Sequence, residues 1–425
     1  MSRCVPSRIT WMPEADAQAA RAAETAARTA YGRLLATLTA QTGDIATAED
    51  ALADAFATAL RAWPSSGVPD APEAWLLTTA RRRVIDQSRR RETANTASSD
   101  LILRLEEAAL GRLDPDMPDP RLGLMFLCAH PAIDAAVRTP LMMQTVLGLD
   151  AARIASVFLV KPSAMSARLV RAKAKIKAAG IPFGIPGRDA WTHRLGSVLN
   201  AVYGAFTAGW TEAAPEDAGG DSLASEAEWL ARLLASQLPE SGESAGLLAL
   251  ILFCEARRPA RTGPDGSYVP LREQDTALWD MNMIGEANDL LRAAAKCDDG
   301  GRFQIEAAIQ SVHTLRSVTG ETDWPVLLSL YDALLRVAPS FGAVIARAAV
   351  LGDLGDAAAG LAALDDLPKD RIDAYGPYHA TRGHLLLQLG ETRLAHDALL
   401  RASELVGDGP AKHWLKDRAK AVSPH

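Results

Sequence analysis

Six basic side chains between residues 161 and 177 give this sequence its most distinctive chemistry. They are Lys161, Arg168, Arg171, Lys173, Lys175 and Lys177, and no acidic residue interrupts them. Ammonium and guanidinium groups pair with phosphates, and a solvent-facing helix usually mixes both signs of charge. The imbalance therefore predicts a polyanionic partner whose phosphates replace the missing carboxylates. An ordinary basic surface helix is the competing interpretation.

Residues 148–181, which surround these side chains, predict two helices joined by a turn. The first helix has one buried face at i, i+3 and i+4, formed by Ile154, Val157 and Phe158. We expect the turn at residues 159–161, because Pro162 restricts its predecessor to extended geometry. Ser163 is then a natural N-cap for the second helix. This pattern predicts a helix-turn-helix.

The second helix sorts its residues into faces at about 100° per residue. The predicted core stripe consists of Met165, Leu169, Ala172 and Ile176. A basic stripe of Arg168, Arg171 and Lys175 lies beside it. The arc opposite the core holds small or medium side chains at Ser163, Ala167, Val170 and Ala174. The backbone can approach another surface closely there, so we expect this helix to lie on DNA.

A second basic cluster occupies residues 81–91, where six arginines face a single acidic residue, Asp86. It lies at the end of a helix predicted to begin at Pro72 or Glu73, after a loop over residues 64–72. Arginine binds phosphate through two parallel hydrogen bonds, and aromatic rings such as Trp75 stack on unpaired bases. The cluster predicts contacts with partly single-stranded DNA, whereas a solvated charged face is the alternative.

The helix predicted before that loop carries acidic residues opposite an apolar stripe. The stripe consists of Ala48, Leu52, Ala55, Phe56, Ala59, Leu60 and Trp63. Thr47 is placed to cap the helix, and Glu49, Asp50 and Asp54 project from its other side. Acidic residues near a helix start also stabilise the helix dipole, which gives the patch a local explanation. As a functional surface, the patch would bind a basic partner.

Composition predicts a soluble all-α protein, since Ala and Leu dominate and aromatics are only 5% of the 425 residues. The net charge of −7 disfavours a nucleic-acid partner at first sight. Residues 1–190, however, hold 24 Lys and Arg against 20 Asp and Glu, and the remainder holds 21 against 32. A basic binding half joined to an acidic half fits this asymmetry. An acidic half that folds back and masks the basic half fits it too.

Four cysteines are spread without metal-binding spacing, at Cys4, Cys128, Cys254 and Cys297. They predict reduced thiols in a cytoplasmic protein. Cys128 and His130 have no second pair to complete a metal site, so we expect neither a metal nor a cofactor. The longest apolar run, residues 247–254, is too short to span a bilayer, and we expect no membrane partner.

No pattern in the sequence indicates catalysis. A nucleophile with its base, paired carboxylates and a glycine-rich phosphate loop are not evident. His130, His313 and His379 are isolated, and lone histidines on helices are more often structural than catalytic. We therefore expect a binding protein and not an enzyme.

Three segments, in chain order, resemble regions 2 and 4 of extracytoplasmic-function RNA polymerase sigma factors. They read AEDALADAFATALRAW, AWLLTTARRRVIDQSRRR and GLDAARIASVFLVKPSAMSARLVRAKAKIK. Later segments, among them FTAGW, GLLALILFCEARRPAR and LLLQLGE, look like the subgroup with a long helical extension of tetratricopeptide-like repeats. The resemblance implies region 2 in residues 1–92, a linker in 93–120, region 4 in 121–187 and the extension in 188–425.

The resemblance also implies a role for each candidate site. Glu49, Asp50 and Asp54 would dock on the β′ clamp helices of core RNA polymerase, with the β flap as a second polymerase contact. The −10 promoter element would be bound by Trp75, Arg81, Arg82, Arg83, Arg89 and Arg90. The −35 element would be read by Lys161, Ser163, Ser166, Ala167, Arg168, Arg171 and Lys175. Such a protein directs polymerase to promoter DNA and opens it.

The second half predicts helix after helix, with an internal repeat near its end. Leu354-Gly355 and Leu389-Gly390 lie 35 residues apart, close to the tetratricopeptide period of about 34. Counted from each glycine, Ala359 matches Leu394, Ala363 matches Ala398 and Leu364 matches Leu399. Stacked helical hairpins form a concave surface, so the extension either binds a protein or peptide partner or is a scaffold packed on the sigma part. We expect it to regulate the sigma part.

Two other functions fit the same residues. A DNA-binding repeat-domain regulator that never joins polymerase would not need the acidic patch at Glu49, Asp50 and Asp54. A small-molecule sensor would bind its ligand in the extension, and ligand-dependent thermal shifts of that part would support it.

Overall fold

The structure, a computed structural model, describes residues 14–91, 119–158, 160–181, 188–212, 223–297 and 300–422. The regular elements in these ranges are all helical, apart from one isolated bridge between Thr262 and Tyr268. The expected all-α class is therefore confirmed. The chain forms two compact units, Met1–Glu212 with Gly219–Ala227 and Ala213–Ala218 with Glu228–His425. No helix in the described ranges is long and apolar enough to cross a membrane.

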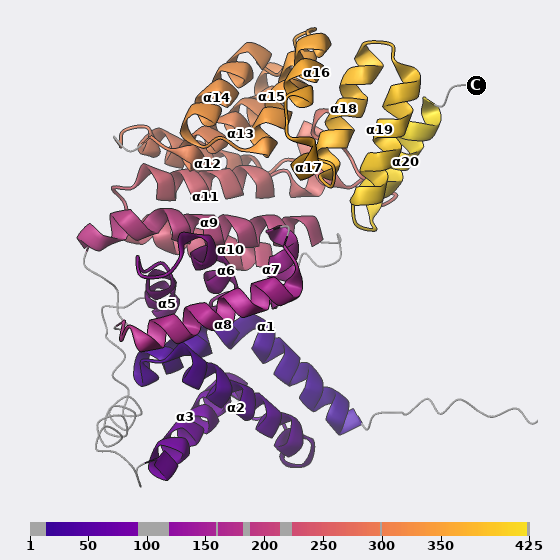
Figure 1. Ribbon diagram of the computed structural model, residues 1–425. Helices are drawn as coiled ribbons and strands as arrows, with labels where there is room; N and C mark the ends of the chain where they lie inside the picture. The colour runs from indigo at the N-terminus through magenta and orange to yellow at the C-terminus, as the bar shows by residue number, and fades with distance from the viewer. Residues whose placement is uncertain are drawn as a thin grey trace, which may run out of the picture. The chain divides into compact units, whose positions relative to one another are not determined.

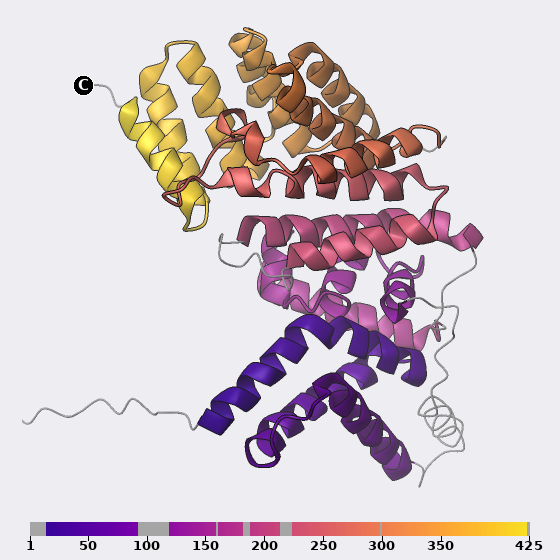
Figure 2. The same ribbon diagram turned by 180° about the vertical axis from the view of Figure 1, so that it is seen from behind.

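The first unit is built from helices that pack on α1 or on its neighbours. They are α1 (Glu14–Thr42), α2 (Ile45–Ser66), α3 (Pro72–Arg91), α5 (Pro120–Cys128), α6 (Ala135–Thr145), α7 (Ala151–Val157), α8 (Pro162–Ala178) and α9 (Arg188–Glu212). Helices α1, α2 and α3 pack on one another, and α5 and α6 contact α1 from another side (Figure 1). Figure 2 shows the same packing from behind. The predicted start of the helix at Pro72 or Glu73 is confirmed, because α3 begins at Pro72.

The core between α1, α2 and α3 is rich in alanine, which lets the helix backbones approach closely. On α2 the buried residues are Ala48, Ala51, Leu52, Ala55, Ala59 and Trp63. Leu60 is 49% exposed and Phe56 is half-buried, so the predicted stripe is wrong at these two residues. The buried face is centred on Ala55 and Ala59 and extends to Ala51, which leaves Phe56 and Leu60 at its edge.

The turn between α1 and α2 is formed by Gly43 and Asp44. Gly43 adopts φ of 67°, a left-handed conformation that favours glycine. The Asp44 carboxylate then accepts a hydrogen bond from the Ala46 amide at 3.1 Å and caps α2. The predicted cap, Thr47, is wrong: its hydroxyl lies inside the helix and donates to Asp44 Oδ2 at 2.7 Å.

Two close contacts attach helices of the second part of this unit to their neighbours, one between α1 and α6 and one between α5 and α9. Gly32 of α1 lies so near the end of α6 that a Cβ there would be 1.8 Å from the Val146 carbonyl oxygen. Arg194 of α9 donates to the Phe126 carbonyl of α5 at 3.1 Å. Helix α9, which the sequence places in the extension, therefore packs on α5 and α6 in the first unit. The domain boundaries themselves stay a prediction.

The second unit is a series of helices that follows α10 (Leu223–Gln237), whose first residues belong to the first unit. Its α-helices are α11 (Gly242–Glu255), α12 (Met281–Ala294), α13 (Arg302–Thr319), α14 (Trp324–Val337), α15 (Phe341–Asp353), α16 (Ala357–Asp365), α17 (Lys369–Ile372), α18 (Gly376–Gln388), α19 (Thr392–Leu405) and α20 (Pro410–Ala421). Short 3₁₀ turns lie at Arg258–Arg261, Leu271–Glu273 and Thr276–Leu278. Helix α11 is buried along most of its length because α12 and α13 both pack on it.

The last part of the second unit repeats one turn geometry. Helices α15 and α16, and likewise α18 and α19, pack as pairs joined by a turn. Gly355 and Gly390 both adopt left-handed φ, 91° and 78°. The next amide returns to the end of the preceding helix in both turns, from Asp356 to Leu351 and from Glu391 to Leu386, each at 2.9 Å. The 35-residue match thus corresponds to two equivalent turns, while a tetratricopeptide relationship stays a prediction.

Candidate nucleic-acid interface

Helix α8 is anchored through the core stripe that its sequence predicts. Met165, Leu169, Ala172 and Ile176 are all buried, against α6 and α7. On α7, Ile154 is buried as expected, but Phe158 is 37% exposed. The prediction for Phe158 is wrong because α7 ends at Val157, so Phe158 lies in the following turn and not on the buried helix face. The side chain of Val157 lies outside the described residues.

The start of α8 differs from the prediction by one position. The helix begins at Pro162, and Lys161 occupies the N-cap position without a side-chain capping bond. Proline at the first helical position loses nothing by lacking an amide hydrogen, and its fixed φ suits the helix. Ser163, predicted as the cap, is therefore an exposed residue of the first helical turn.

The remaining face of α8 is open to solvent. Its exposed residues include every predicted −35 contact, namely Lys161, Ser163, Ser166, Ala167, Arg168, Arg171 and Lys175. The side chains of Arg168, Arg171 and Lys175 form no hydrogen bond or ion pair with a described residue. These three cations line a cavity of ≈ 310 Å³, together with Asp134 and Val137 near the start of α6, so three cations face one carboxylate there. Unpaired cations around a hollow form a site suited to phosphate oxygens.

The arginines of α3 are not equivalent. Arg81 donates through Nε to Gln41 Oε1 at 3.1 Å, and burial lowers the pKa of its guanidinium. Arg83 Nε lies 3.6 Å from Asp54 Oδ2, whereas Arg82 is exposed and forms no such contact with a described residue. Trp75 lies upstream and packs edge-on against Trp63, with ring centroids 5.5 Å apart.

Arg89 and Arg90 lie in the last turns of α3, but their side chains are outside the described residues. The predicted short helix over residues 101–110 and the linker also fall outside the described part of the chain. Among the three described arginines of this cluster, Arg82 is thus the side chain most available to a polyanion.

The three acidic residues of the α2 patch also differ in whether a basic side chain pairs with them. Asp50 is exposed and makes no ion pair with a described residue. Asp54 faces Arg83, and Glu49 is engaged by Lys173 of α8. The three acidic residues therefore lie on one helix, as predicted, but only Asp50 presents an unpaired carboxylate.

Two lysines of α8 join this helix to α2. Lys173 Nζ donates to both carboxylate oxygens of Glu49, each at 2.6 Å. Lys177 Nζ donates to Asp44 Oδ2 at 2.7 Å. Burial raises the pKa of the Asp44 carboxyl, but the hydrogen bonds from Lys177 and Thr47 outweigh it, and its pKa lies below the ordinary value.

The contacts of these two lysines with α2 differ from the prediction, in which both belong only to the basic run of α8. Lys173 and Lys177 were counted in the basic run but assigned no contact, and Asp44 was assigned none either. A signal was present, because i and i+4 spacing places both lysines on one side of α8, next to its core stripe. Nothing local in the sequence indicates that α2 is the helix they meet.

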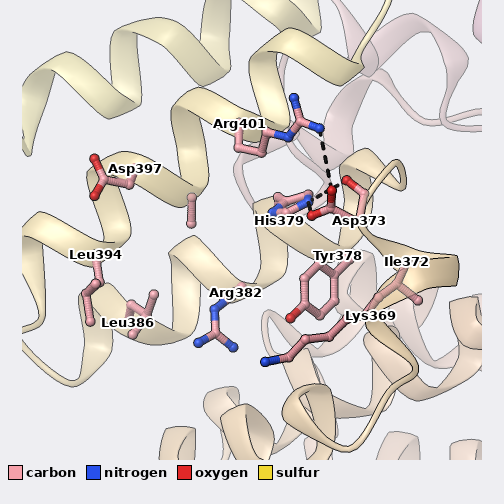
Figure 3. A pocket seen from close by; sticks show the side chains of 11 residues that line it. Lys369, Ile372, Asp373, Tyr378, His379, Arg382, Leu386, Leu394, Asp397 and Arg401 are labelled. Carbon is pink, nitrogen blue, oxygen red and sulfur yellow. Dashed lines mark hydrogen bonds and ion pairs between the residues drawn. The ribbon is translucent and has the colours of Figure 1, made fainter.

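The second unit contains a groove of ≈ 330 Å³ between α17, α18 and α19. Lys369, Tyr378 and Arg382 turn their polar ends toward one another on one side, while Leu386 and Leu394 line another part (Figure 3). Arg382 also pairs with Asp365. His379 Nε2 lies 3.0 Å from the Asp373 carbonyl oxygen, the kind of structural hydrogen bond expected for this isolated histidine.

The thiols and metal-binding residues show no further site in the described ranges. Cys128, Cys254 and Cys297 are free, and burial raises the pKa of Cys128 to about 12. No group of three or more His, Cys, Asp or Glu residues that could hold a metal ion occurs among the described residues.

Parts of this chain are similar to known protein families. Residues 27–93 match sigma-70 region 2, and residues 194–295 match a family of unknown function, DUF6596. An uncharacterized protein of Rhizobium meliloti (strain 1021) is 37% identical over 376 residues, which cover 87% of this chain and 88% of that protein. The chain belongs to the family of that protein. No solved structure matches it.

This chain thus combines a sigma-70 region 2 domain with a DUF6596 domain. The region 2 match covers most of α1 with all of α2 and α3, the helices that carry the acidic patch and the arginine cluster. This match supports a sigma-factor role in transcription initiation, with core RNA polymerase and promoter DNA as the partners.

Proposed function

We propose that the protein is an alternative sigma factor of the extracytoplasmic-function type, which binds core RNA polymerase and opens a specific set of promoters. Region 2 would occupy residues 1–92, the linker 93–120, region 4 121–187 and a regulatory tetratricopeptide-like extension 188–425. The observation that carries the proposal is the unpaired basic face of α8 in the same unit as the sigma-70 region 2 match.

In this proposal α7 and α8 form a helix-turn-helix that reads the −35 element. Arg168, Arg171 and Lys175 would bind backbone phosphates and fix the register of the helix. Ser166 and Ala167 are small and exposed, so they would approach the base edges in the major groove, the Ser166 hydroxyl by hydrogen bonding and the Ala167 methyl by apolar contact. Lys161 and Ser163 would extend the contact at the start of the helix.

Helices α2 and α3 would make the remaining contacts. Trp75 and the arginines of α3 would bind the −10 element, with Arg82 as the most accessible described cation. Glu49, Asp50 and Asp54 would dock on the β′ clamp helices, and region 4 would reach the β flap. The chemistry of RNA synthesis would remain with polymerase.

Run-off transcription tests the proposal, with core polymerase and promoters selected from a library of genomic fragments. We expect Arg168→Ala with Arg171→Ala to abolish most promoter-specific transcript while core binding persists. The matched control, Lys296→Ala with Arg393→Ala, removes two exposed, unpaired charges from the second unit. If the first variant transcribes like the control, α8 does not read the promoter.

A DNA-binding regulator that never joins polymerase is distinguished by the exposed carboxylate of Asp50. Asp50→Arg reverses a charge that makes no ion pair with a described residue, so it should weaken co-purification with core polymerase and leave DNA binding unchanged. The regulator alternative requires instead that wild-type protein never co-purifies with core.

For the extension, the groove of α17 to α19 supports a role in binding an acidic peptide. The Lys369 ammonium has no hydrogen-bond partner among the described residues, and Leu386 and Leu394 supply an apolar wall in another part of the groove. The groove also holds Asp373, which pairs with Arg401, and Asp397. An extended peptide that alternates carboxylate and aliphatic side chains would satisfy both. Peptide occupancy would then regulate the sigma part.

Fluorescence anisotropy with the full chain tests this groove. We expect an alternating Asp-Leu peptide to bind, a matched Lys-Leu peptide not to bind, and Lys369→Glu to abolish binding of the first. Equal binding of both peptides, or binding unaffected by Lys369→Glu, would exclude the groove as the peptide site and favour a purely structural extension.

A further inference from the structure

The contact between α8 and α2 joins the helix proposed to read DNA to the helix proposed to bind polymerase. Its two ion pairs lie one helical turn apart, Lys173 with Glu49 and Lys177 with Asp44. On α8 both lysines lie on the side that the exposed Arg168 and Arg171 leave free. Docking on α2 therefore covers Glu49 of the acidic patch while the −35 face stays open.

The inner pair is largely removed from solvent. The side chain of Lys173 is 12% exposed and that of Glu49 is 21% exposed. Both Glu49 oxygens accept hydrogen bonds from the same ammonium group, which neutralises the carboxylate and restricts the access of an external cation to it. The outer pair is more accessible, because the Lys177 side chain is 60% exposed.

The surroundings of Glu49 strengthen this pairing. Burial raises the pKa of Tyr31 of α1, and Tyr31 lies close enough to Glu49 for that charge to raise it further. A charge in such surroundings is poorly solvated and depends on a partner. Gly32 of α1 lies close to the Val146 carbonyl at the end of α6. This contact joins α1 to α6 at another point of the first unit.

We propose that Lys173–Glu49 and Lys177–Asp44 form an intramolecular latch that competes with core polymerase for the acidic end of α2. This inference rests on the proposed function and concerns regulation of the same site. In the latched chain Glu49 is covered by α8, so polymerase must displace Lys173 before its own basic groups can reach the carboxylate. Binding to polymerase and latching are then mutually exclusive.

The apparent affinity of the chain for core polymerase depends on the fraction of chains in which the latch is open. A partner that binds only the open form has its apparent affinity reduced by the fraction of chains that are open. If roughly one chain in ten is open, removal of the latch tightens polymerase binding by about tenfold. The −35 face is not covered, so DNA binding by α8 alone changes little.

Charge reversal tests the latch in the full chain. Lys173→Glu with Lys177→Glu places like charges against Glu49 and Asp44. The distance between α2 and α8 is followed by energy transfer between dyes on non-canonical amino acids at Ser66 and Ala179, both exposed. We expect this distance to increase and core polymerase to bind about tenfold more tightly. A control, Ala174→Glu with Ala178→Glu, adds negative charge to exposed positions of α8 and should leave the distance unchanged.

A variant in which the acidic and basic partners are exchanged distinguishes loss of the ion pair from general destabilisation of the fold. Adding Glu49→Lys to Lys173→Glu restores the inner pair with its charges exchanged and keeps the Asp44 cap of α2, so it should return the distance to the wild-type value. Circular dichroism checks that each variant folds, and Lys177→Ala, at the exposed pair, provides a milder opening. An unchanged distance in the folded charge-reversed variant would overturn the latch, even if wild-type protein supports transcription. An increased distance without polymerase binding by any form would instead leave the latch standing and remove the proposed function.

Discussion

Lys173 of α8 donates two hydrogen bonds of 2.6 Å to Glu49 of α2, across 124 positions of the sequence. The pair joins a helix rich in unpaired cations to a helix in the sigma-70 region 2 match. Both side chains are mostly buried, so the pair should contribute to the stability of the first unit.

Breaking one side of this pair should destabilise the first unit. Lys173→Met leaves the Glu49 carboxylate partly buried without its cation, and we expect a loss of about 3 kcal/mol in the free energy of unfolding. Adding Glu49→Leu replaces the whole pair by apolar side chains and should recover most of that loss. Urea unfolding of the two variants and of Glu49→Leu alone gives the coupling energy, and simple additivity would contradict a direct pair.

The outer pair gives stability a dependence on pH. The pKa of Asp44 is lower in the folded chain than in the unfolded chain, since Lys177 and Thr47 stabilise its charged form more than burial disfavours it. This stabilisation is fully present above the unfolded carboxyl pKa, near about 4, and is lost as the pH falls through the lower folded value. Asp44→Asn keeps a capping side chain for α2 but removes the charge. Unfolding measured from neutral pH to pH about 3 should therefore show a shallower loss of stability for the variant. Parallel curves would contradict the assignment.

The unpaired cations of α8 should determine the salt dependence of DNA binding. Each phosphate contact contributes about one unit to the slope of log affinity against log salt concentration. Arg168→Ala with Arg171→Ala should therefore reduce that slope by about two, as measured by fluorescence anisotropy on a promoter duplex. A weaker affinity with an unchanged slope would mean that these arginines do not contact phosphates.

Gly32 should be sensitive to the smallest side chain. Gly32→Ala places a methyl group against the Val146 carbonyl oxygen, a backbone atom that cannot move away cheaply, and we expect a loss of about 1–3 kcal/mol. Gly285→Ala is the matched control in α12, where an added Cβ meets no atom within 4 Å. It should stabilise its helix by about 0.5–1 kcal/mol. Thermal unfolding of both variants checks the opposite signs.

Local periodicity predicted much of this fold. The stripe of Met165, Leu169, Ala172 and Ile176 is buried as predicted, because helical spacing alone decides which residues of α8 share a face. The predicted caps at Thr47 and Ser163 were wrong, because Asp44 and Pro162 compete for the same helix starts and lie one to three residues earlier. Such choices depend on single hydrogen bonds that a residue pattern does not resolve.

The candidate site was predicted less completely than the helices. Basic residues could be counted, but their partners could not, since Arg81 meets Gln41 and Arg83 meets Asp54 only after α1, α2 and α3 have packed. The pair of Lys173 and Glu49 depends on a contact between distant segments, for which no sequence period exists. The exposed residues of α8 were predicted well, because once the buried stripe of a helix is known, most of its other residues face solvent.

Promoter melting tests the central claim most directly. A sigma factor should let core polymerase open DNA that neither component opens alone, and permanganate detects the thymines that become unpaired. We predict reactive thymines near the start site only when the full chain and core polymerase are present together, and their loss with Arg168→Ala and Arg171→Ala. Stable binding of the chain to promoter DNA, with no thymine reactivity after core polymerase is added, would contradict the sigma-factor account.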